Sequence, residues 1–145
     1  MDFKVKFDPI WIKERIDKNC VDFTEELGKF LCDINDRGFS GPSALTTSQI
    51  RNFFGEVKRI QLSGIEKGNN RSAFLLIRPK LAYAEARAKM RNSRSRITIF
   101  KEVVQKAHAE VDTNASDDVL KTSFQNFVDF LESILAYHKS YGGRD

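Results

Sequence analysis

The spacing of apolar residues constrains this chain more than any other feature of its sequence. Between Thr46 and Met90 they recur every three or four positions, in two runs separated by a polar joint. Similar runs fill most of the remaining chain, and the alternation typical of strands is absent. The pattern therefore predicts an all-α fold, a single compact bundle of five or six helices. At 100° per residue, one side of the first run collects Ile50, Phe53, Phe54, Val57 and Ile60.

Capping and helix-breaking residues predict where these helices begin and end. Ser, Thr and Asp cap helix starts, proline suits a first turn, and glycine ends helices in the left-handed conformation. The second run from Thr46 should therefore start a new helix at Pro79, after a break at Arg78-Pro79. The first helix should begin at Asp8-Pro9, with an apolar stripe reaching Ile16. The second should begin at the capping box Asp22-x-x-Glu25 and end near Arg37-Gly38, and the third should begin at the capping box Thr46-x-x-Gln49. The last helix should begin at Ser116 or Asn114 and end at Gly142-Gly143.

Length and composition indicate one ordinary globular domain. The 145 residues predict a single helical domain over 1–145, in which residues 1–7 form either a short extended arm or a disordered one. No apolar stretch approaches the length of a membrane span, and the N-terminus lacks a signal-peptide pattern. Cys20 and Cys32 fit neither a metal site nor a disulfide framework. We therefore expect reduced, partly buried thiols in a cytoplasmic protein without a membrane partner.

Positive charge is concentrated in the middle of the chain. The formal net charge is +4, but residues 46–106 alone carry +10, whereas residues 1–45 carry −2 and residues 107–145 carry −4. Arginine outnumbers lysine in the basic middle, and its planar guanidinium suits phosphate. Such a directed patch favours contact with nucleic acid over general stickiness.

The basic residues also follow helical spacing. In the first run, Arg51, Lys58 and Arg59 fall together on a side away from the apolar stripe. In the second run, Lys80, Arg87 and Arg91 lie nearly in line, about 10 Å and then about 6 Å apart along the helix. These two rows predict contacts to a sugar–phosphate backbone, which position a strand without reading its sequence.

Catalytic chemistry has little support in this sequence. His108 and His138 stand in no metal-binding spacing, and we expect structural or surface roles for both. Tyr83 and Tyr137 are expected at the rim of the core. No nucleophile motif, phosphate-binding loop or zinc motif occurs. We therefore expect no catalytic residues, no metal, no cofactor and no enzymatic activity.

Two segments of the basic middle resemble a known family. The segments LTTSQIRNFFGEVKRI (45–60) and LLIRPKLAYAEARAK (75–89) resemble segments of the small subunit of type III-A CRISPR effector complexes, the Csm complexes. That family is a compact helical protein of about this length, so the resemblance covers essentially the whole chain. It implies that several copies stack as a short filament beside the subunits that hold CRISPR RNA, and that they help to bind target RNA. Cleavage and cyclic-oligonucleotide synthesis belong to other subunits.

The resemblance also implies which residues face RNA and which surfaces meet other subunits. Self-contact would come from the acidic first two helices and the last helix, giving a dimer or a head-to-tail filament. Arg94 and Arg96 lie outside the matching segments, so an RNA-binding role for them is predicted from their charge alone. The implied RNA-binding residues are Gln49, Arg51, Asn52, Lys58, Arg59, Arg78, Lys80, Arg87 and Arg91.

Two other classes of protein stay open at this point. TTSQIRNFF resembles the recognition helix of a helix-turn-helix DNA-binding regulator, although the preceding FSGPSAL loop is longer than the usual turn. A helical protein–protein adaptor, whose charge only aids solubility, would bind no RNA.

Overall fold

The computed structural model describes residues 5–32, 47–89 and 94–142, and every regular element in these ranges is a helix. The all-α prediction is confirmed. Five helices are long, whereas α1 and α4 are short. In chain order the helices are α1 (Ile10–Lys13), α2 (Lys18–Leu31), α3 (Thr47–Ser63), α4 (Asn70–Leu75), α5 (Ile77–Lys89), α6 (Arg94–Ala109) and α7 (Asp117–Ser140).

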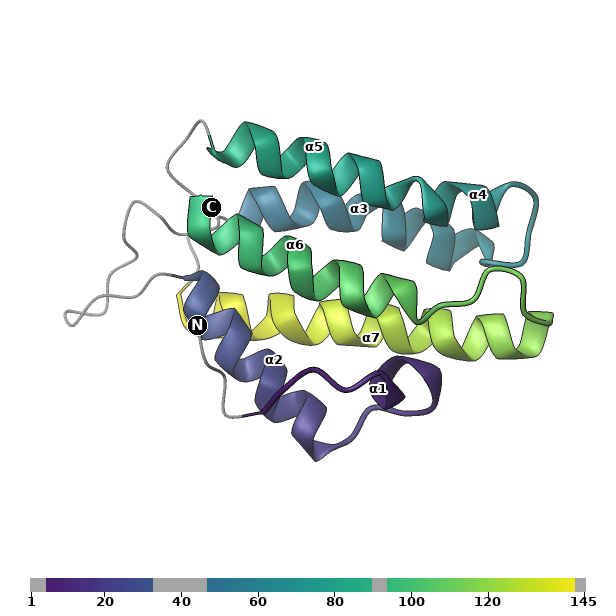
Figure 1. The fold of residues 1–145 in the computed structure, drawn as a ribbon, viewed down its shortest axis with the longest axis horizontal. Helices are drawn as coiled ribbons and strands as arrows, with labels where there is room; N and C mark the ends of the chain where they lie inside the picture. Colours follow the sequence, from purple (N-terminus) through teal and green to yellow (C-terminus); the bar gives the residue numbers. More distant parts are fainter. Residues whose placement is uncertain (1–4, 33–46, 90–93, 143–145) are drawn as a thin grey trace.

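The bundle is organised around α7, the longest helix. It packs against α1, α2, α3 and α6, while α5 packs on α3 and α6 at the edge of the bundle (Figure 1). Figure 1 shows α5 and α2 on opposite sides of the molecule, with α7 between them. One hydrophobic cluster joins all these helices, from Trp11 in α1 to Ile134 in α7. None of the helices in the described ranges is long and apolar enough to span a bilayer.

The start of α2 differs from the predicted capping box. The helix begins at Lys18, because the carboxylate of Asp17 accepts a hydrogen bond from the backbone N–H of Cys20 (2.9 Å). Asp22 lies inside the helix and pairs with Lys18 one turn earlier (2.9 Å). Asp17 has no acidic or amide partner three positions on, so a search for complete capping boxes overlooks it. α2 ends at Leu31, well before the predicted stop at Gly38, which lies outside the described residues.

The break ahead of α5 falls earlier than predicted. α4 ends at Leu75 and α5 begins at Ile77, so Pro79 is the third residue of α5 and not its first. Proline has no N–H to donate to the carbonyl of Leu75, four residues before it, and in a continuous helix its ring would clash with that carbonyl. The break between α4 and α5 at Leu76 avoids this clash. Within the first turn of α5, the missing N–H of Pro79 costs nothing.

The outer helices show how far apolar patterning predicts helix bounds. α1 stops at Lys13, although Ile16 still packs against the core from the following link. α7 begins at Asp117 with Ser116 at its N-cap, and Gly142 follows its end with φ +88°, as predicted. Val119, an apolar residue in the first turn of α7, is 56% exposed. The Thr46 cap of α3 lies outside the described residues.

The polar and sulfur groups of the core are structural. His108 Nε2 lies 2.7 Å from the carbonyl oxygen of Phe74, and the two rings stack 4.0 Å apart. Burial lowers the pKa of His108, so the stacked imidazole is neutral at pH 7. Cys20 and Cys32 are free and buried, as predicted. Burial raises the pKa of Cys20 to about 12 and of Cys32 to about 11, which leaves both thiols poor nucleophiles.

Candidate nucleic-acid interface

A groove of about 560 Å³ runs between α3 and α5. Its floor is apolar, and includes Phe53 of α3, Ile77 of α5 and Ile97 of α6. Ile77 and Ile97 are buried, so their apolar side chains form the inner surface of the groove. Four residues of the predicted RNA-binding set line its walls: Gln49 and Asn52 from α3, and Lys80 and Arg87 from α5.

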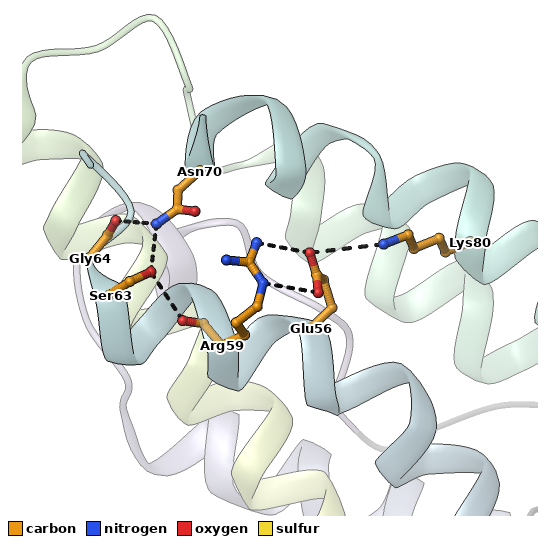
Figure 2. Close-up of polar contacts among 6 residues, drawn as sticks. All are labelled: Glu56, Arg59, Ser63, Gly64, Asn70 and Lys80. Atoms are coloured by element: carbon orange, nitrogen blue, oxygen red, sulfur yellow. Dashed lines mark hydrogen bonds and ion pairs between the residues drawn. The ribbon is translucent and has the colours of Figure 1, made fainter. Parts of the chain in front are cut away.

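A carboxylate bridges the two walls at one end of the groove. Glu56 of α3 accepts hydrogen bonds from the guanidinium of Arg59 (3.0 and 3.2 Å) and lies 3.9 Å from the Lys80 ammonium (Figure 2). The hydrogen bond from Arg59 holds the pKa of Glu56 below its ordinary value, so the bridge is charged at neutral pH. Glu56 thus fixes both cations beside the groove while it neutralises part of their charge. The sequence carried a signal for this contact, since Glu56 and Arg59 are three residues apart on a helix.

The same region is fixed by the turn that follows α3. Gly64 has φ +99°, a conformation that favours glycine and ends the helix. The side-chain amide of Asn70, at the start of α4, donates to the carbonyl of Gly64 (2.6 Å) and to the hydroxyl of Ser63 (2.8 Å), as Figure 2 shows. Ser63 in turn donates to the carbonyl of Arg59 (3.2 Å). This network ties the end of α3 to the start of the α4–α5 segment and so sets the two groove walls side by side.

An exposed tyrosine stands at the other end of the groove. Tyr83 was expected at the core rim, but it is 66% exposed and lines the groove. At 100° per residue it lies about 200° from the buried Leu81, so its outward direction could have been read from the helix period. The guanidinium carbon of Arg87 lies 5.9 Å from the centre of the Tyr83 ring, within cation–π range.

The groove wall formed by α5 is held to the bundle by a partly buried ion pair. Glu85 is 8% exposed, and its carboxylate accepts a hydrogen bond from the Lys101 ammonium of α6 (2.9 Å). Glu85 faces inward with Leu81, while Lys80, Tyr83 and Arg87 face the groove. The sequence did not single out this pair, because its partners are 16 residues apart on different helices.

Two predicted RNA-binding residues lie away from the groove. Lys58 pairs with Glu132 of α7, and its ammonium lies 5.5 Å from the centre of the Phe54 ring. Arg78 is exposed, but at 100° per residue it lies about 160° around α5 from Lys80, on the opposite edge of the helix. Arg96, which was singled out by charge alone, packs its guanidinium 4.8 Å from the centre of the Phe30 ring of α2.

The structure thus brings together part of the predicted set. Arg59 lies beside the groove through its contact with Glu56, whereas Arg51 is exposed about 160° around α3 from Gln49, on the same side of the helix as Lys58. The RNA-binding role of each residue stays a prediction. By location, Gln49, Asn52, Lys80 and Arg87 line the groove, Arg59 flanks it on α3, Arg51, Lys58 and Arg78 lie elsewhere, and Arg91 lies outside the described residues.

Fold and groove together define a class of protein: a small all-α binding protein with a cationic, amide-lined groove between two adjoining helices. Within the described ranges, no group of three or more His, Cys, Asp or Glu residues could hold a metal ion.

The family model for Csm2 of type III-A matches residues 18–144, and the chain belongs to this family. It is therefore a small subunit of the type III-A CRISPR effector complex, the Csm complex, which confirms the resemblance found in the sequence. Members are structural subunits generally considered non-catalytic, and membership implies association with the complex and its CRISPR RNA. Searches of curated proteins and of solved structures return no match.

Proposed function

We propose that this chain is a non-catalytic subunit that holds CRISPR RNA and target RNA through contacts to the sugar–phosphate backbone. The observation that carries the proposal is the α3–α5 groove, which collects Gln49, Asn52, Lys80 and Arg87 from two helices. Arg59 extends the same polar surface along α3 through its contact with Glu56. Backbone contacts suit a subunit that must serve any guide sequence, because phosphates carry no sequence information.

We further propose that copies stack head to tail in the cytoplasm. The basic α5 lies on the opposite side of the molecule from α2 (Figure 1). The α2 side carries an acidic depression lined by Asp22, Glu25 and Glu26. A basic face and an acidic face at opposite sides can meet between successive copies, a heterologous contact that propagates as a filament.

Reversing two charges at the groove is expected to weaken RNA binding. The double variant Arg59→Glu/Arg87→Glu replaces two exposed cations at the groove with anions, one on each wall helix. Each lost guanidinium–phosphate contact removes a charge-assisted hydrogen bond. We expect the affinity for single-stranded RNA to fall about tenfold or more, which corresponds to about 1.4 kcal/mol or more. Filter binding or fluorescence anisotropy measures this loss, and circular dichroism checks that helicity is unchanged.

A matched variant separates the groove from net charge. Lys106→Glu/Lys121→Glu makes the same change in net charge at exposed positions on α6 and α7. We expect it to retain most of the affinity, since neither lysine lines the groove. Equal losses in the two double variants would show that RNA responds only to overall charge, and the groove would then have no special role.

A further inference from the structure

The α3–α5 groove has features that backbone binding alone does not require. A surface that binds only the phosphate backbone needs cations, yet this groove also has an apolar floor that includes Phe53, Ile77 and Ile97. The Phe53 ring is held in place by an edge-on contact with Phe100, with ring centres 5.9 Å apart. Flat aromatic ligands bind in such settings, where apolar surfaces cover their faces and polar groups meet their edges.

The polar groups are placed at the edges of the groove. Gln49 and Asn52 each carry an amide, which can donate and accept hydrogen bonds. These amides lie near the start of α3, whereas Glu56 lies one turn further along, beside Lys80. Within the described part of the groove, Glu56 is the one carboxylate that lines the walls, and Arg59 and Lys80 offset its charge.

Tyr83 and Arg87 give the opposite end of the groove a stacking platform with a cation beside it. They are four residues apart on α5, so both project from the same helix face. Tyr83 leaves two thirds of its surface in solvent and lines the groove, so its ring is open to a ligand there. Unstacked bases bind to proteins in this way, on an aromatic face with hydrogen bonds to the base edge.

We infer that the groove receives one unpaired nucleotide of the bound RNA strand, an inference that rests on the RNA binding proposed above. The base stacks on Tyr83 over the apolar floor, its edge meets the amides of Gln49 and Asn52, and its phosphate lies on Arg87. Amides can present a donor or an acceptor to any base, so the site holds a nucleotide without selecting its identity. A base in a duplex cannot enter, because both of its faces are already stacked.

The test uses a single-stranded oligoribonucleotide that contains a fluorescent adenine analogue, whose emission is quenched by stacking. We expect the full-length protein to quench the probe on binding. The variant Tyr83→Leu should lose the quenching and bind the strand about fivefold or more weakly. Tyr83→Phe keeps the ring and should retain both properties. Tyr141→Leu removes a ring on the α2 side of the molecule and serves as a control for loss of any tyrosine.

The outcomes distinguish this inference from the proposed function. Quenching that requires an aromatic ring at position 83 supports the nucleotide site. If the strand binds and Tyr83→Leu behaves like the unchanged protein, base insertion is overturned while RNA binding stands. If addition of the protein changes the emission of the probe equally within a continuous RNA duplex, where the base is already stacked, base insertion is also overturned. If the unchanged protein binds no RNA, both the inference and the proposed function are overturned.

Discussion

Replacing Phe127 with alanine is expected to lower the free energy of unfolding by about 3–5 kcal/mol. Phe127 lies in the middle of α7 and has no exposed surface. Its ring packs edge-on against Phe74, with ring centres 5.3 Å apart, and lies 6.0 Å from the His108 ring. Truncation leaves a cavity where α4, α6 and α7 meet, because close-packed neighbours relax only in part. Urea denaturation followed by circular dichroism measures the change.

Val119→Ala supplies the matched control on the same helix. Val119 is mostly exposed, so its truncation should change the free energy of unfolding by less than about 0.5 kcal/mol. A loss below about 1 kcal/mol for Phe127→Ala would contradict the central position of α7 in the bundle.

Replacing Gly28 with alanine is expected to cost about 3 kcal/mol, at the upper end of the range for overpacked cores. A methyl group at Gly28 would lie 2.7 Å from Cβ of Tyr137 and 2.8 Å from the backbone nitrogen of His138. Both atoms belong to α7, so α2 and α7 would have to move apart along their most extensive contact. Thermal and urea denaturation both report the loss.

Gly55→Ala should have the opposite sign. Gly55 is exposed within α3, and a methyl group there would have no atom within 4 Å. Alanine restricts the unfolded chain and favours helix, so we expect a gain of about 0.5–1 kcal/mol. A gain in stability, or no change, for Gly28→Ala would contradict the close crossing of α2 and α7.

The helices could largely be predicted from the sequence, because their apolar stripes are strong local signals. Ile50, Phe54, Val57 and Ile60 are buried as their period predicts. The errors fall at helix ends, where one hydrogen bond decides the outcome. Asp17, which lacks the reciprocal partner of a complete capping box, caps α2 five residues before the cap expected at Asp22.

The candidate site was predicted only in part, because a helical period places residues on one helix but does not say which neighbour covers each edge. Lys58 was predicted on the same side of the helix as Arg51, yet its ammonium forms an ion pair with Glu132 of α7, 74 residues away in the sequence. Lys80 and Arg87 do reach a common groove, because α5 packs beside α3. Glu56 was missed as a bridge between two helices, since only the fold brings Lys80 close to it.

The most direct measurement of where RNA lies is photocrosslinking in the assembled effector complex, with photoreactive uridines along the CRISPR RNA and the target RNA. Mass spectrometry then locates the adducts on this chain. We expect them on α3 between Gln49 and Arg59 and on α5 between Lys80 and Arg87. Adducts confined to α1, α2 or α7, with none on α3 or α5, would contradict the assignment of the α3–α5 groove as the RNA-binding surface.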